Sequence, residues 1–220
     1  MRTSAGVTGL LCALLLVIVV VGGLVVGVGD RDDDRIDIPE DVPPADAGDV
    51  ADVAGTASSL DISEDFLVAY LAGAESAATE YPDCHLAWNT LAGIGYVESR
   101  HGSYGVRNGR ITGPALDGSG GFMEIPDTDD GRLDGDREYD RAVGPMQFLP
   151  DSWRMLGDGG DPQDITDAAP AAARLLCAGG RDLATPEGWS EAVLAYNRSG
   201  EYLTTVRDAA ANYAVGQPAA

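Results

Sequence analysis

Apolar residues recur at helical spacing through most of the chain after residue 60. Phe66, Tyr70 and Ala74, for example, lie one turn apart. This period predicts amphipathic helices that bury one face, and Ser, Thr or Asp residues stand at the expected helix starts. The expected helices begin near Ser63, Leu86, Asp151, Asp167, Thr185 and Ser199. The pattern therefore predicts a mainly α fold, without an internal repeat.

Residues 103–141 interrupt the helical pattern. This segment is crowded with Gly, Asp and Arg and has no helical period. Loops of this length inside a compact domain tend to carry function. We expect a short hairpin within it, formed by residues 110–112 and 122–125. The sequence thus predicts one helical domain at 61–214 with a long irregular insertion, followed by a tail at 215–220.

The N-terminal part differs in composition from this domain. Residues 7–28 form a nearly unbroken apolar run, long enough to span a bilayer. Arg2 precedes the run and four Asp residues follow it closely, which predicts a cytoplasmic N-terminus and an exported remainder. We expect a transmembrane signal anchor at 1–29, with a cleaved signal peptide and a secreted protein as the alternative. Residues 30–60 are rich in Asp, Ala, Gly and Pro and predict a disordered acidic linker.

The charge balance narrows the possible partners. The chain has 36 acidic residues against 14 basic ones, all Arg, and a formal net charge of -22. Such a surface repels polyanions, so we expect no binding to nucleic acid.

The cysteines add a second constraint, on covalent links and metal binding. With Cys12 inside the apolar run, export favours a disulfide between Cys84 and Cys177. A zinc site that adds His85 and His101 is the alternative, although the spacing matches no common ligand pattern.

Glu98 is the most unusual residue of the helical pattern. It follows Ala87, Leu91 and Ile94 on one helical stripe, where a core helix would carry an apolar side chain. Burial and the negative end of the helix dipole both raise the pKa of a carboxyl group. Glu98 would then hold its proton near neutral pH, as a general acid must. The alternative is a structural Glu paired with Arg100 or Arg141.

Three short motifs occur in a fixed order: GYVESRHG at 95–102, GPMQFLPDSW at 144–153 and AYNRS at 195–199. Together they resemble the lytic transglycosylases, relatives of goose-type lysozyme, and most closely the exported actinobacterial members. The resemblance covers about residues 61–213. It implies a lysozyme-like fold and cleavage of the β-1,4 bond between N-acetylmuramic acid and N-acetylglucosamine in peptidoglycan. The expected product is a 1,6-anhydro sugar.

The resemblance also assigns residues. It makes Glu98 the single catalytic acid and base, with Ser99 beside it as part of the family pattern. Met146 and Gln147 belong to a segment that lines the sugar-binding cleft, and Tyr196 and Asn197 match a Tyr-Asn pair that contacts substrate. A rival for a second catalytic carboxylate is Asp140, for which an ion pair or a loop cap is the alternative role. Glycosidases with two carboxylates would need such a partner.

We expect no cofactor and no metal, because the stretch after the Met-Gln-Phe segment, residues 157–162, is too short for the EF-hand-like loop that some transglycosylases carry there. Asp127, Asp129 and Glu138 follow the count of an EF-hand loop, but Arg132 stands where that loop requires Gly. We therefore expect no calcium site. The expected partners are peptidoglycan glycan strands, and the membrane through the N-terminal helix; the protein is expected to be a monomer. A muramidase on the same fold and a non-catalytic peptidoglycan-binding module are the alternative functions.

Overall fold

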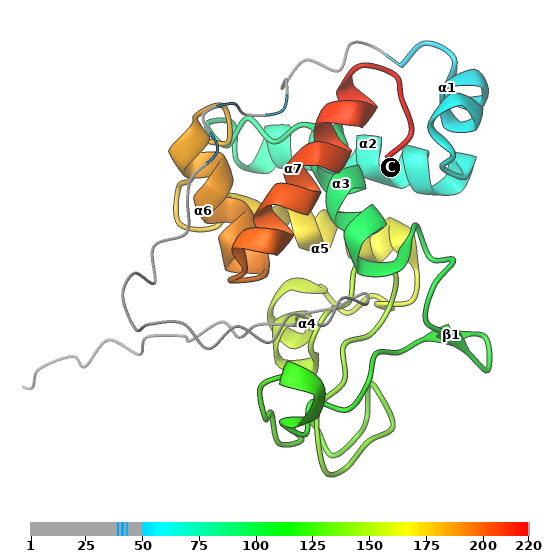
Figure 1. Cartoon of the computed structure of the whole chain (residues 1–220), viewed down its shortest axis with the longest axis vertical. Coiled ribbons are helices and arrows are strands. Elements are labelled where there is room, and N and C mark those ends of the chain that lie inside the picture. The colour runs from blue at the N-terminus through cyan, green and yellow to red at the C-terminus, as the bar shows by residue number, and fades with distance from the viewer. Residues whose placement is uncertain (1–38, 40, 42, 44–49, 220) are drawn as a thin grey trace, which may run out of the picture.

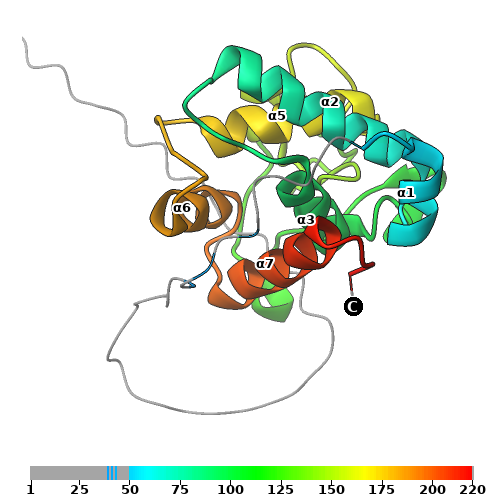
Figure 2. The ribbon, with the colours of Figure 1, turned by 90° about the horizontal axis from the view of Figure 1, so that it is seen from above.

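Two helix pairs form the centre of the computed structural model, which describes residues 39, 41, 43 and 50–219. α2 packs along α5, and α3 packs along α7 (Figures 1 and 2). The helices are α1 (Val53–Leu60), α2 (Glu64–Glu80), α3 (Trp88–Ser99), α4 (Pro150–Leu156), α5 (Ile165–Cys177), α6 (Pro186–Tyr196) and α7 (Gly200–Ala214), with a 3-10 turn at Ser119–Gly121. A two-stranded sheet joins β1 (Val106–Arg107) to β2 (Arg110–Ile111). The mainly helical character agrees with the sequence pattern.

α3 is the central helix, and most of its residues are buried. Glycines on two of its faces let neighbouring helices approach closely. A Cβ atom at Gly93 would lie 2.9 Å from the carbonyl oxygen of Val206 on α7. A Cβ atom at Gly95 would lie 2.0 Å from the hydroxyl oxygen of Tyr70 on α2. Any side chain at these positions would push α3 away from its neighbours, so the glycines fix where the end of α3 lies.

Side chains cap two helices where the sequence predicts, whereas Ser63, the predicted cap of α2, stands at the N-cap position without a side-chain cap bond. The Thr185 hydroxyl accepts the Gly188 N–H at the start of α6, and the Ser199 hydroxyl accepts the Tyr202 N–H at the start of α7. The predicted cap of α5, Asp167, lies three residues after the residue that caps the helix. Asp164 caps this helix through the Thr166 N–H, while the carboxylate of Asp167 accepts the N–H of Asp161 in the preceding loop.

Cys84 and Cys177 form the predicted disulfide, with an S–S distance of 2.00 Å and a Cα–Cα distance of 5.4 Å. The bond joins the segment before α3 to the last residue of α5. Two further contacts fasten the same place: Leu183 N–H donates to the Cys84 carbonyl at 2.8 Å, and His85 pairs with Asp182 at 2.7 Å. With both sulfur atoms bonded to each other, the alternative zinc site is wrong.

The predicted transmembrane helix is not supported. No helix in the described part of the chain is long and apolar enough to cross a membrane. The predicted span at 7–28 lies outside the described residues, as does most of the predicted linker. The end of that linker is not irregular: residues 53–60 form α1, which Asp52 caps. The missed signal is the helical spacing of Val53, Ala57 and Leu60, of which the last two are buried.

The predicted hairpin has the wrong second strand. β2 pairs with β1, so that Arg107 lies opposite Arg110 and Val106 opposite Ile111. Asn108 and Gly109 form the turn between them with φ angles of 50° and 76°. An Asn-Gly pair favours such a two-residue hairpin turn, because both positions need positive φ. The predicted strand 122–125 makes isolated bridges and packs Ile125 against Leu116 and Ala142 in a small second core.

Candidate active site

Glu98 is buried in the last turn of α3, with 7% of its surface exposed. The hydroxyl of Tyr202 donates a hydrogen bond to its Oε1 at 2.6 Å. Tyr202 comes from the first turn of α7, the helix that packs along α3. The position of the carboxyl group is therefore set by the packing of two helices rather than by a loop.

Burial raises the pKa of Glu98 to about 8, and the hydrogen bond from Tyr202, which favours the ionised form, opposes this rise. Both guanidinium groups that the sequence offers as ion-pair partners are engaged elsewhere. The Arg100 guanidinium carbon lies 3.8 Å from the centre of the Tyr96 ring. Arg141 pairs with Asp136 at 2.8 Å and donates to the Gly113 carbonyl. Glu98 is thus a carboxyl group that keeps its proton at neutral pH.

Ser99 ties the end of α3 to the second motif. Its hydroxyl donates to the Pro145 carbonyl at 2.7 Å and accepts the Gly102 N–H at 2.8 Å. The same hydroxyl therefore holds both the turn after α3 and the segment 144–147. Its role is to position Glu98 relative to that segment.

Met146 and Gln147 lie in this segment with different environments. The Met146 side chain is fully buried in the core, so its backbone rather than its thioether contributes to the site. Gln147 has a φ of 48°, and its amide nitrogen donates to the Gly144 carbonyl at 2.9 Å. Gly113 lies against the other end of this amide: a Cβ atom there would be 3.1 Å from Gln147 Oε1. Gln147 is 9% exposed.

Tyr196, the last residue of α6, joins the third motif to the second. Its hydroxyl donates to the Met146 carbonyl at 2.7 Å. Its ring lies nearly parallel to that of Tyr202, with 6.5 Å between the ring centres. Asn197 follows at the end of α6 with its side chain buried. The three motifs, far apart in the sequence, are therefore brought together through direct contacts around Glu98.

Tyr202 is the site residue that sequence reasoning missed. It stands on the stripe of α7 with Val206, Ala209 and Tyr213, which indicates a core position. A buried Tyr hydroxyl needs a hydrogen-bonding partner, and this requirement is the one indication in the sequence that Tyr202 contacts a polar group. The pattern of one helix does not show which partner the neighbouring helix supplies.

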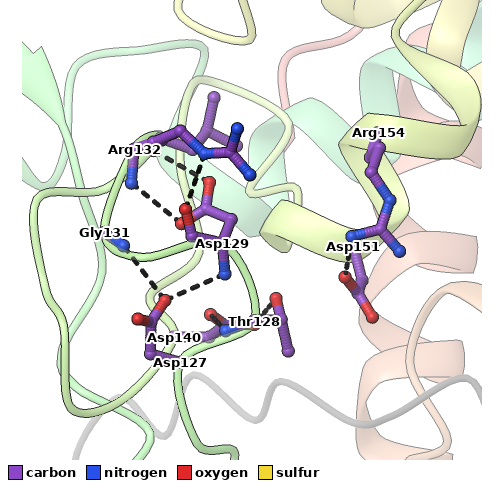
Figure 3. A network of polar contacts seen from close by, with 9 residues as sticks. Asp127, Thr128, Asp129, Gly131, Arg132, Asp140, Asp151 and Arg154 are labelled. Carbon is purple, nitrogen blue, oxygen red and sulfur yellow. Dashed lines mark hydrogen bonds and ion pairs between the residues drawn. The ribbon is translucent and has the colours of Figure 1, made fainter.

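Five carboxylates of the loop 126–141 accept hydrogen bonds from the loop itself, and Figure 3 shows those of Asp127, Asp129 and Asp140. Asp127 Oδ1 accepts the N–H groups of Asp129 and Gly131, and Asp129 accepts those of Arg132 and Leu133. Self-contained turns of this kind are typical of Asp in tight loops. Among the described residues, no group of three or more His, Cys, Asp or Glu side chains could hold a metal ion.

Asp140, the rival catalytic carboxylate, also serves the loop. It is 1% exposed and accepts both the N–H and the hydroxyl of Thr128, at 2.9 and 2.8 Å. Burial raises its pKa from the ordinary value, and the two bonds from Thr128 oppose this. Asp140 is therefore a loop cap, the alternative role that the sequence allows. The site that remains has one protonated carboxyl group, Glu98, which accepts a hydrogen bond from the Tyr202 phenol and lies close enough to Tyr196 to raise the pKa of that phenol.

Comparisons with family models, with curated proteins and with solved structures give no match to this chain.

Proposed function

We propose that this protein is a lytic transglycosylase that cleaves the β-1,4 bond between N-acetylmuramic acid and N-acetylglucosamine in peptidoglycan. One observation carries the proposal. Glu98 is a buried carboxyl group with a pKa of about 8, and its hydrogen-bonding partner is a phenol rather than a cation. A carboxylic acid that stays protonated at neutral pH can donate a proton to a glycosidic oxygen.

The reaction needs one group that first gives and then takes a proton. Because Tyr202 donates to Oε1, the acid proton of Glu98 is placed on Oε2. Transfer of this proton to the glycosidic oxygen releases the N-acetylglucosamine side as an alcohol. The resulting carboxylate then takes the proton of the muramic acid 6-hydroxyl while that oxygen bonds to C1. The ring closes to a 1,6-anhydro sugar, Glu98 is protonated again, and no water is consumed.

Tyr202 supports both halves of this cycle. Its hydroxyl bond stabilises the carboxylate that exists between the two proton transfers, because a hydrogen bond to the charged form favours that form. Burial favours the protonated state of Glu98 before the first proton transfer and after the second. The opposing effects keep the pKa of Glu98 near the working pH, where general acid–base catalysis is most effective.

The remaining carboxylates favour a one-carboxylate mechanism. Hydrolysis with two carboxylates requires a nucleophile or a base beside the acid. Asp127, Asp129 and Asp140 are held by N–H groups of their own loop. The substrate's own 6-hydroxyl can take the place of the missing nucleophile. The disulfide between Cys84 and Cys177 supports an extracytoplasmic location, where this substrate lies.

The test is digestion of purified peptidoglycan by the parent protein and by Glu98→Gln, with mass analysis of the fragments. We expect 1,6-anhydromuramic acid ends from the parent and a rate lower by about 10²–10⁴-fold for the variant. Glu201→Gln, in the first turn of α7, is the matched control and should digest like the parent. Reducing muramic acid ends would indicate a muramidase instead. Binding without cleavage by the parent would indicate a peptidoglycan-binding module.

A further inference from the structure

Residues 99–116 form a positively charged segment in an acidic protein. They contain Arg100, Arg107 and Arg110 and no Asp or Glu, although 36 of the 220 residues of the chain are acidic. Arg100 lies over the Tyr96 ring. The side chains of Arg107 and Arg110 make no hydrogen bond or ion pair with any described residue, and both residues are at the surface. This segment is therefore a cationic site without an anionic partner in the described structure.

The hairpin β1–β2 places these two cations together. Arg107 and Arg110 are directly opposite in the antiparallel register, so their side chains leave the same face of the hairpin. Like charges in directly opposed positions destabilise a strand pair. An anion between the two guanidinium groups would remove this repulsion. Tyr104, just before the hairpin, is 63% exposed and adds apolar surface, whereas Val106, 53% exposed, pairs with Ile111 on the opposite face.

The base of the hairpin is fastened to both sides of the site. On one side, the Tyr104 N–H donates to the carbonyl of Ser99, the residue after Glu98, at 2.8 Å. On the other side, the Gly144 N–H donates to the Ile111 carbonyl at 2.9 Å, within the segment that carries Gln147. The hairpin itself projects from the body of the molecule beyond the end of α3 (Figure 1). Its cations therefore stand beside the glycan site and outside it.

The β2 edge of the hairpin is closed to another strand at Ile111. The Gln163 side chain accepts the Ile111 N–H at 2.7 Å and donates to the Ile111 carbonyl at 2.8 Å. This pair of bonds occupies the backbone groups through which a peptide would add to β2. On this edge a ligand is recognised through side chains rather than through added strand pairing.

We propose that Arg107 and Arg110 bind the carboxylates of the stem peptides that peptidoglycan carries on its muramic acid residues. This proposal rests on the proposed function, which places the glycan at Glu98 and the stems outside it. Charge complementarity selects the occupant. The rest of this acidic surface repels an anionic polymer, whereas two guanidinium groups side by side suit a carboxylate. The hairpin makes the protein prefer glycan that still has its peptides.

The test compares binding of two ligands to the full chain carrying Glu98→Gln, which prevents turnover. One ligand is a peptidoglycan oligosaccharide with its stem peptides, and the other is the same oligosaccharide after an amidase has removed them. We expect the first to bind about three- to tenfold more tightly at low salt, as for two exposed ion pairs. Adding Arg107→Gln/Arg110→Gln to this chain should bring the ratio of the two affinities close to one. High salt should do the same for the Glu98→Gln chain with both Arg residues in place.

The matched control is Arg132→Gln/Arg154→Gln, which removes the same charge from two Arg residues outside this segment and should preserve the ratio. Equal binding of both ligands to the Glu98→Gln chain would overturn the proposal, as would an unchanged ratio after the two Arg substitutions are added to it. Displacement by inorganic phosphate at lower concentration than by free stem peptide would assign the hairpin to a phosphate polymer and also overturn it. Preference for stems without cleavage by the parent would refute the transglycosylase and leave the hairpin proposal standing.

Discussion

The Tyr202 hydroxyl and the Glu98 carboxyl group are joined by a 2.6 Å hydrogen bond, although 104 positions separate them in the sequence. Burial of Glu98 favours its neutral form, and the bond from Tyr202 favours its ionised form. The two effects differ in size, and burial is the larger. The result is a carboxyl group with a pKa of about 8, and Tyr202 is the residue that keeps this value from rising further.

Replacing Tyr202 by Phe should therefore raise the pKa of Glu98 above that of the parent. The substitution removes a hydrogen-bond donor from Glu98, and this loss destabilises the carboxylate more than the neutral carboxylic acid. We expect the alkaline limb of the pH–rate profile to move to higher pH and the rate at neutral pH to fall, because the carboxylate intermediate is less stable. The free energy of unfolding should fall by about 1–2 kcal/mol.

Tyr213→Phe is the control for this change. The Tyr213 hydroxyl contacts His101 rather than Glu98, so its loss should leave the alkaline limb where it is. NMR titration of the Glu98 carboxyl carbon would measure the shift directly. An unchanged titration in Tyr202→Phe would show that the phenol does not act on the acid.

The raised pKa of Glu98 also makes stability depend on pH. Between pH 4.5, the ordinary pKa, and about 8, the folded protein holds a proton that the unfolded chain releases. Stability therefore falls as pH rises through this window, by about 1.4 kcal/mol per pH unit for this group. Glu98→Gln has no such proton, so its free energy of unfolding relative to the parent should increase from pH 5 to 8 and then level off. Denaturant unfolding at several pH values measures the difference, and parallel curves would contradict the burial of a titrating acid.

Local patterns in the sequence predict much of this site but not its geometry. Short-range rules predict the caps at Thr185 and Ser199 and reveal Glu98 as a carboxyl group on an apolar stripe. The pairing of Cys84 with Cys177 depends on a small number of choices. The contact between Glu98 and Tyr202 depends on how α3 and α7 pack, which no local period encodes.

The errors have equally specific reasons. Two Asp residues stand near the start of α5, and only the loop contact from Asp167 to Asp161 separates their roles, so the local pattern does not identify Asp164 as the cap. The predicted partner strand of the hairpin is wrong, although Asn108 and Gly109 carry a strong turn signal. The composition of the preceding segment, rich in Asp, Gly and Pro, masks the helical spacing of α1.

The disulfide should make a large contribution to stability. It closes a loop with a sequence separation of 93, for which constraint of the unfolded chain predicts about 4–5 kcal/mol as an upper value. We expect Cys84→Ser/Cys177→Ser to unfold at markedly lower temperature and lower denaturant concentration than the oxidised parent. Parent protein treated with a reductant is the control and should behave like the double variant. Free thiols in the untreated parent would contradict the bond.

Gly95 should not tolerate a side chain, because α3 lies against the Tyr70 hydroxyl at this position. A Cβ atom at Gly95 would be 2.0 Å from that oxygen and 2.8 Å from the ring carbon that carries it. We expect Gly95→Ala to lower the free energy of unfolding by about 1–3 kcal/mol, as for other overpacked cores. Tyr70→Phe removes the nearer atom, so the same Gly95→Ala change should cost less in that background. Additive effects of the two changes would show that the contact is not the cause.

His101 should make the protein less stable in acid. Its Nδ1 lies 3.0 Å from the Tyr70 hydroxyl and its Nε2 lies 2.8 Å from the Tyr213 hydroxyl, so both ring nitrogens are engaged. Burial, and to a smaller extent the charge of Arg100, lower the pKa of His101 from 6.5 to about 4. In this window the unfolded chain binds a proton that the folded protein excludes, so stability falls as pH falls from 6.5 to 4, by a total of roughly 2–3 kcal/mol. His101→Gln keeps polar atoms between the two hydroxyls but does not titrate. We expect the parent to lose stability relative to this variant as the pH is lowered, and a constant difference between pH 7 and pH 4.5 would mean that His101 is protonated without cost in the folded protein.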